Sequence, residues 1–276
     1  MYNYLNLLNF INSFNNLAKY FGLFLCLLIP SLGAQTPHTI YFLEDFRPYV
    51  YLDENQQPAG LMSELVIKAL EDSGLDYQLV PNNVSRLFME IKKGGNVSTF
   101  GVYKTAEREQ WSIVTPEIYR APQPVLVIKK TKLDQIPSSL TLQSFEALLE
   151  QQHLTGVIIK NYSYGNLFDP LFEAKRTQVQ RYQLSIEQAF KMITSPHRAD
   201  FTLAYPAQAR YLVEQNEHFK HNLAIVPFVD IPANDRGAFW MFSKDSDPKF
   251  IEKIENAMNK VRHSAFYETT VRKYVE

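Results

Sequence analysis

The segment GVYKTAEREQW, residues 101–111, places one arginine just after the end of an apolar run. Thr105 followed by Ala-Glu-Arg-Glu is typical of a helix N-cap and first turn, where most charged side chains are solvated. Because the turn follows a predicted strand, the Arg108 guanidinium could instead form a bidentate pair with a carboxylate. From the residues alone, Arg108 is therefore either an ordinary surface charge or a contact to an anionic ligand.

Two further segments combine aromatic and polar side chains next to predicted strands. DFRPYVYLD carries Phe46 and Tyr49 after the first strand, with Glu44 beside them. These rings are either the wall of a site or the alternating aromatics of a half-buried strand. KNYSYG follows the apolar run GVIIK and provides Lys160, Ser163 and backbone donors at a helix start, which suits an anion. An ordinary loop between a strand and a helix is the alternative.

Motifs for catalysis or cofactor binding are missing from the sequence, in which no P-loop, GxGxxG, GxSxG or HExxH occurs. The six histidines are scattered. His218 and His221 lie close together, but a third metal ligand is not evident. We therefore expect no catalytic residues, no metal site and no cofactor, and a binding function is favoured.

Charge and composition narrow the function further. The formal net charge of −1 over 276 residues provides no basic field that would attract nucleic acid. Aromatic residues make up 13% of the chain. This content favours a site that contacts its ligand with ring faces, although most rings will lie in the core.

Residues 1–34 differ from the rest of the chain. They contain one basic residue, Lys19, and no acidic one, followed by the apolar run YFGLFLCLLIP and the small residues of SLGA. This order predicts a cleaved secretory signal peptide and a periplasmic protein, and an uncleaved N-terminal anchor is the alternative. Cys26 is the only cysteine, so the mature protein is predicted to have no disulfide, cysteine-based zinc site or thiol nucleophile.

The remaining chain alternates predicted strands and helices, which indicates an α/β fold with mainly parallel sheets flanked by helices. A β-α-β-α-β unit spans residues 38–103, a proline-rich connection follows, and a second α/β unit extends to LAIVPF. We expect lobe 1 to comprise residues 35–120 plus 236–276 and lobe 2 residues 121–235. Ligands of such folds bind beyond the carboxyl ends of strands, here in the cleft between the lobes.

Five segments, in their order along the chain, can be compared with known proteins. They are PYVYLDENQQPAGLMSELVIKAL, GVYKTAEREQWSIVTPEIYRAPQPVLV, LTGVIIKNYSYG, HRADFTLAYPAQARYLV and GAFWMFSKDSDPKFIEKIENAMNKV. The second resembles the first-lobe signature Gly-x-Thr-x-Thr-x-Glu-Arg, followed by Phe-Ser-x-Pro-Tyr, of the amino-acid-type (family 3) extracellular solute-binding proteins. The other four resemble further parts of that family, and the resemblance covers essentially the whole mature chain. It implies a two-lobed periplasmic-binding-protein-like fold of type II.

The resemblance also assigns roles to individual residues. It places Arg108 where the family holds the α-carboxylate of the ligand, and Gly101 and Tyr103 where a backbone carbonyl and a Thr hydroxyl meet the ligand amino group. Phe46 matches an aromatic residue that stacks on the ligand. The second-lobe loop that meets the ligand corresponds to Lys160, Ser163 and Tyr164.

Two positions depart from the family pattern. Tyr103 stands where the family has Thr, and Tyr205 stands where it has the Asp that neutralises the ligand ammonium. A buried ammonium without a counter-charge costs several kcal/mol, although Glu44 could replace the missing carboxylate. We therefore expect a carboxylate-bearing or aromatic solute, a modified amino acid or a small peptide in preference to an ordinary free amino acid.

These observations predict a monomeric periplasmic binding protein that closes on a small solute by hinge motion. Its partner would be an ABC permease or a membrane sensor. An enzyme resembling the periplasmic dehydratases of this fold is one alternative, with Glu44, Lys160 or Glu117 as acid or base. A protein that binds only a partner protein is another. A closed, charged and aromatic cleft would favour solute capture, and a filled cleft would favour the protein-interaction role.

Overall fold

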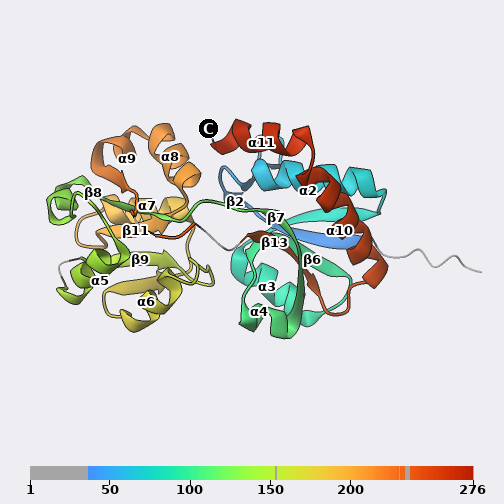
Figure 1. The fold of residues 1–276 in the computed structure, drawn as a ribbon, viewed down its shortest axis with the longest axis horizontal. Coiled ribbons are helices and arrows are strands. Elements are labelled where there is room, and N and C mark those ends of the chain that lie inside the picture. Colours follow the sequence, from blue (N-terminus) through green and yellow to red (C-terminus); the bar gives the residue numbers. More distant parts are fainter. Residues whose placement is uncertain (1–36, 153, 230, 234–236, 276) are drawn as a thin grey trace, which may run out of the picture. The chain divides into compact units, whose positions relative to one another are not determined.

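The computed structural model of the protein describes residues 37–152, 154–229, 231–233 and 237–275. The predicted signal peptide, residues 1–34, lies outside this part of the chain. The described residues form two five-stranded sheets and one small three-stranded sheet, with helices against the two larger sheets (Figure 1). No helix in these ranges combines the length and the apolar character that crossing a membrane requires.

The first sheet has the strand order β5-β1-β6-β13-β7. β1 pairs in parallel with β5 and β6, whereas β13 pairs antiparallel with β6 and β7. The strands are β1 (His38–Leu43), β5 (Tyr77–Asn82), β6 (Val97–Tyr103), β7 (Ser112–Tyr119) and β13 (Ala238–Ser243). A strand from the end of the chain is thus inserted between strands from its first half.

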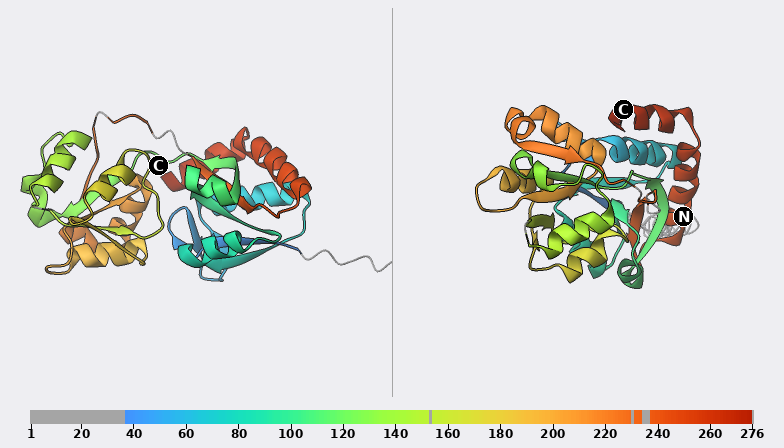
Figure 2. Two further views of the ribbon diagram at one scale, coloured as in Figure 1. Left: turned by 90° about the horizontal axis from the view of Figure 1, so that it is seen from below. Right: turned by 60° about the vertical axis from the view of Figure 1, so that its left-hand side comes forward.

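Helices on both sides of the first sheet bury its apolar side chains (Figure 2). They are α2 (Leu61–Ser73), α3 (Val84–Lys93), α4 (Ala106–Trp111), α10 (Pro248–Arg262) and α11 (Ala265–Val275). α2 ends at Gly74 as predicted, because the φ of 62° at this residue favours glycine. α10 begins at Pro248, and the Asp247 Oδ1 caps it by accepting the Lys249 N–H at 2.9 Å.

The second sheet has the strand order β10-β9-β11-β8-β12, again with two parallel and two antiparallel pairings. Its strands are β8 (Val125–Lys129), β9 (Gly156–Ile159), β10 (Val179–Tyr182), β11 (Phe201–Ala204) and β12 (Leu223–Val226). Its helices are α5 (Leu142–Glu150), α6 (Phe168–Ala174), α7 (Ile186–Thr194), α8 (Pro206–Gln215) and α9 (Glu217–Asn222). α7 starts with the predicted capping box, in which Ser185 and Gln188 each accept the other's backbone N–H.

The proline-rich segment 115–139 is more ordered than the sequence indicates. It supplies most of β7, all of β8 and the 3-10 helix η2 (Lys130–Gln135). Pro116 is compatible with a strand because β7 lies at the edge of its sheet. β8 is an unbroken apolar run, typical of a strand covered on both faces, and the neighbouring prolines concealed this signal.

Two connections link the larger sheets. The chain passes from the first sheet to the second between Tyr119 and Val125, and it returns between Val226 and Ala238. We propose that each sheet with its helices is one lobe and that the lobes divide within these connections.

The third sheet positions the aromatic residues that the sequence singled out. It consists of β2 (Asp45–Phe46), β3 (Val50–Leu52) and β4 (Pro58–Ala59). Gly60 joins β4 to α2 with a φ of 106°, and a Cβ there would lie 2.7 Å from the carbonyl oxygens of Pro48 and Tyr49. These same oxygens accept the N–H groups of Leu61 and Met62 at 3.1 and 2.9 Å. The start of α2 therefore holds the loop that carries Tyr49.

We expect Gly60→Ala to destabilise the protein more than Gly74→Ala. Gly74 also has a positive φ, but no atom lies within 4 Å of a Cβ built there, so Ala should cost only the conformational penalty of about 1–2 kcal/mol. At Gly60 the same penalty is joined by a clash with backbone. Urea unfolding of both variants tests this, and equal losses would contradict the account.

His38 is expected to make stability depend on pH. Its side chain is buried, stacks on Phe250 with ring centroids 3.9 Å apart, and has its Nδ1 2.7 Å from the Asn96 Oδ1. Burial lowers the pKa of His38 to about 4 and outweighs the hydrogen bond to Asn96 and the charge of Asp247, which both raise it. The unfolded chain then binds the proton more readily, so the free energy of unfolding should fall between pH 6.5 and 4, by roughly 3 kcal/mol at most.

His38→Asn is the matched variant, because its amide can still donate to Asn96 but does not titrate. Urea unfolding at several pH values measures the difference in stability between the wild type and this variant. The difference should shrink as the pH falls through this range. A difference that stays constant from pH 7 to pH 4 would assign the titration to other groups.

Candidate ligand-binding site

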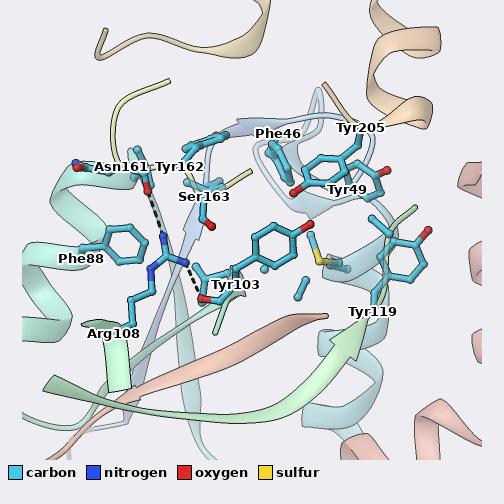
Figure 3. Close-up of a pocket in the computed structure, with 17 residues that line it drawn as sticks. Phe46, Tyr49, Phe88, Tyr103, Arg108, Tyr119, Asn161, Tyr162, Ser163 and Tyr205 are labelled. Carbon is cyan, nitrogen blue, oxygen red and sulfur yellow. Dashed lines mark hydrogen bonds between the residues drawn. The ribbon is translucent and has the colours of Figure 1, made fainter. Parts of the chain in front are cut away.

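A small cavity of about 70 Å³ lies where the first sheet, the third sheet and loops of the second sheet meet (Figure 3). Seven of the 17 described residues that line it are aromatic, and Arg108 is the one charged residue among the 17. The predicted site residues in this wall are Phe46, Tyr49, Gly101, Tyr103, Arg108, Ser163 and Tyr205. The sequence therefore predicted much of the wall, although the binding role of these residues stays a prediction.

Arg108 is buried and is not a solvated surface charge. α4 begins as predicted, with the Thr105 Oγ1 accepting the Arg108 backbone N–H at 3.2 Å, and this cap directs the arginine side chain inward. The guanidinium lies 4.6 Å from the centroid of the Phe88 ring. Its Nη1 donates to the Tyr103 carbonyl at 2.6 Å and its Nη2 donates to the Asn161 carbonyl at 3.1 Å.

These two carbonyls belong to different lobes of the proposed division. Tyr103 ends β6 of the first sheet, whereas Asn161 follows β9 of the second. Hydrogen bonds from a charged donor contribute about 1.5–3 kcal/mol each. The amide of Asn161 also donates to the Ser85 Oγ at 3.0 Å. Arg108 is thus the centre of a polar contact between the two larger sheets, at one end of the cavity.

Aromatic rings fill the other end of the cavity. Tyr205 packs edge to face against Phe46, Tyr49 and Tyr103, with ring centroids 6.2, 6.0 and 6.2 Å away. Tyr49 in turn lies 5.4 Å from Phe46 and 5.9 Å from Tyr119. Figure 3 shows the Tyr103 ring between Arg108 and the group of Tyr49, Tyr119 and Tyr205. A residue from the second lobe therefore closes the aromatic end.

The tyrosine hydroxyls in this cluster are protonated at neutral pH. Burial raises the pKa of Tyr119 to about 12, and it raises the pKa values of Tyr49 and Tyr205 as well. For Tyr205, the neighbouring hydroxyl of Tyr103 and a hydrogen bond with it act in the same direction. The Tyr49 hydroxyl is buried and has no hydrogen-bond partner among the described residues.

The loop after β9 is built differently from the expected anion cradle. Lys160 is exposed and does not line the cavity. The Tyr164 N–H donates to the Asp169 Oδ1 at 2.8 Å, and the Ser163 Oγ donates to the Asp169 Oδ2 at 2.5 Å. The anion held at this loop is therefore a side chain of the protein. Tyr164 itself accepts the Ile159 N–H at 3.0 Å and lines a smaller neighbouring cavity.

The cavity wall contains no carboxylate among its described residues. Glu44, the suggested replacement for the missing Asp, is exposed and lies outside the wall. Glu117 also lies outside it and accepts two hydrogen bonds from Arg120, at 3.1 and 2.6 Å. Among the described lining residues, the ionic side chain at the cavity is thus cationic.

Several wall residues were not identified from the sequence. These are Leu43, Met62, Val84, Phe88, Val102, Tyr119, Ala121, Asn161, Tyr162 and Ala238. Phe88 belongs to the buried face of α3, and its spacing is that of an ordinary core residue. Tyr119 ends β7, the strand that the prolines concealed. A tyrosine at the end of a strand that crosses to the second lobe is the signal that could have identified it.

The described residues contain no group of three or more His, Cys, Asp or Glu that could hold a metal ion. His218 and His221 lie on α9, and the Nδ1 of His221 is 2.7 Å from the Glu217 carbonyl oxygen of its own helix. The Nδ1 of His218 lies 3.3 Å from the Asn222 side-chain amide on the same helix. The position of the pair on a surface helix agrees with a polar helix end.

Solved structures similar to this chain are two-lobed binding proteins. A histidine kinase sensor domain with similarity to periplasmic binding proteins has a TM-score of 0.69 at 16% identity, covering 87% of this chain and 96% of that one. An arginine-, lysine- and histidine-binding protein from Geobacillus stearothermophilus has a TM-score of 0.66 at 18% identity, with 87% and 95% covered. An ancestral amino-acid-binding precursor of cyclohexadienyl dehydratase has a TM-score of 0.66 at 16% identity, with 86% and 94% covered.

At these identities the structures establish the fold alone, which is the predicted two-lobed periplasmic-binding-protein-like fold. No curated protein matches the chain. The model of the bacterial extracellular solute-binding proteins, family 3, matches residues 39–276, nearly the whole described chain. With this match, and with a cavity bounded by both larger sheets, the chain belongs to the family 3 bacterial extracellular solute-binding proteins.

Proposed function

We propose that the protein captures a small carboxylate-bearing solute between its lobes and that Arg108 binds the carboxylate. The observation that carries this proposal is the buried guanidinium at the end of an aromatic cavity, donating to neutral carbonyls of both sheets. A carboxylate is a stronger acceptor for such a fork than a backbone carbonyl is, and it can accept two parallel N–H groups at once.

Replacement of a carbonyl acceptor of Arg108 by a ligand carboxylate gives a physical reason for capture. A ligand carboxylate that enters beside Tyr103 would take the place of the Asn161 carbonyl on the Nη2 of Arg108. The ion pair would form against the Phe88 ring and away from bulk water, where screening is weak. Asn161 and its neighbours in the second lobe could then contact the rest of the solute.

Capture requires the lobes to separate first. A cavity of about 70 Å³ is far smaller than the roughly 300–1,000 Å³ of pockets that enclose drug-sized ligands. The contacts of Tyr205 with Tyr103 and Phe46 must break for a solute to enter. We propose that the connection 120–124, between β7 and β8, takes part in the hinge of this motion.

A binding role fits the wall better than catalysis does. None of the acid or base candidates of the enzyme alternative, Glu44, Lys160 and Glu117, lines the cavity. The titratable groups that do line it are Arg108 and tyrosines, and burial raises the pKa values of Tyr49, Tyr119 and Tyr205. A general base near neutral pH needs a pKa close to 7. We therefore propose a periplasmic protein that delivers its solute to a membrane partner, an ABC permease or a sensor.

A tightly packed cleft is what the protein-interaction alternative predicts. One observation favours solute capture over it. The Tyr49 hydroxyl lines the cavity and has no partner within the described chain. A buried polar group of this kind is costly in a surface that serves only to pack.

The test compares acids with their uncharged amides, such as 3-phenylpropanoate with 3-phenylpropanamide and propanoate with propanamide. An acid at about 100 times its dissociation constant should add about 2.7 kcal/mol to the free energy of unfolding. The amide should add much less. Thermal unfolding with and without each compound measures the gain, and calorimetric titration confirms binding.

Arg108→Ala and Arg108→Lys should abolish or greatly reduce this gain, each judged against its own ligand-free protein. Lys keeps the charge but lacks the planar fork, so it also controls for loss of folding. Arg86→Ala removes an exposed cation of α3 outside the cavity wall and should keep the full gain. Equal gains from acid and amide, or an acid gain that survives Arg108→Ala, would overturn the proposal.

A further inference from the structure

We infer that the captured acid lacks an ammonium group and carries an uncharged hydrogen-bonding group that pairs with the Tyr49 hydroxyl. The inference rests on the proposed function, because it describes the remainder of the solute whose carboxylate Arg108 binds. The substrates are then hydroxy, keto or acylated acids with an apolar body. Tyr49 is the residue that distinguishes these acids from plain acids.

The charge of the wall argues against an ammonium. Two acidic side chains near the cavity are engaged elsewhere: Asp45 pairs with Arg47 at 2.8 Å, and Asp169 accepts from the Ser163 Oγ and the Tyr164 N–H. A cation buried in this wall would lack a counter-charge among the described lining residues and would also be repelled by the guanidinium of Arg108. A neutral group in the same position needs no counter-charge and is not repelled by Arg108.

The Tyr49 hydroxyl argues for a polar group of the solute in place of a purely apolar one. The residue is 1% exposed and lines the cavity. Contacts with Phe46, Tyr119 and Tyr205 fix its ring, so the hydroxyl has little freedom to turn toward another partner. A hydroxyl both donates and accepts. It can therefore pair with an alcohol, a ketone or an amide.

The packing of the rings disfavours a quaternary ammonium as the second group. Aromatic cages bind such cations with open ring faces. Here Tyr205 meets Phe46 and Tyr49 at interplanar angles of 89° and 88°, so edges and faces are already matched to one another. Opening of the lobes would uncover faces, however, and a betaine is therefore included as a competing probe.

The experiment uses two matched series that differ only in the α-substituent. One consists of L-phenylalanine, L-3-phenyllactate, 3-phenylpropanoate and N,N,N-trimethylphenylalanine, and the other of L-alanine, L-lactate, propanoate and N,N,N-trimethylalanine. Affinities are measured by calorimetric titration of the wild type and of Tyr49→Phe. Tyr182→Phe, which removes an exposed hydroxyl of β10, is the control.

In at least one series the hydroxy acid should bind the wild type at least tenfold more tightly than the amino acid. Tyr49→Phe should lower the affinity for the hydroxy acid about fivefold, to that of the plain acid, and leave the affinity for the plain acid unchanged. Tyr182→Phe should change neither. The difference between the two acids is the readout that a merely structural role of Tyr49 would not produce.

Other results overturn the inference in distinguishable ways. If the amino acid or the betaine binds most tightly, the wall accepts a cation and the substrate class is wrong, while the proposed capture of carboxylates stands. If Tyr49→Phe weakens both acids equally or neither, Tyr49 does not pair with the solute. If no acid of either series binds the wild type, the proposed function fails for these acids and the inference fails with it.

Discussion

The burial of the Arg108 guanidinium is the constraint on which the site depends. A buried charge must be surrounded by acceptors, and two of those here are backbone carbonyls, one at the end of β6 and one in the loop after β9. The cap at Thr105 and the ring of Phe88 set the direction of the side chain. The same interaction therefore orders the start of α4, borders the cavity and joins the two sheets.

At the aromatic end of the cavity, uncharged rings fill the space between the sheets. Tyr205 comes from the second sheet and inserts between rings of the first and third sheets. Its phenol fills volume and supplies a hydroxyl, but it provides no carboxylate to balance a cation. Among the described lining residues there is thus one buried cation and no acid, and this is the basis for proposing a solute without an ammonium group.

Local signals in the sequence predicted most of the fold. Caps and glycines marked helix ends because they act on the adjacent turn, as at Gly74, Ser185 and Asp247. Strand β7 was not recognised, because Pro116 argues against a strand unless the strand lies at a sheet edge. Strand β8 was not recognised, because prolines just before it obscured its apolar run. The edge position of β7 is set by neighbours that are distant in the sequence, as is the pairing of β13 with β6 and β7.

The sequence by itself predicted the family and the alternation of strands and helices, since both depend on residue types in a fixed order. It also singled out Arg108 and Tyr205 as candidate ligand contacts. Only the tertiary structure placed Glu44 outside the cavity wall, put Asp169 at the loop after β9, and brought Phe88 and Tyr119 into the wall. Burial and proximity across two sheets decide such contacts, and neither is encoded in local spacing.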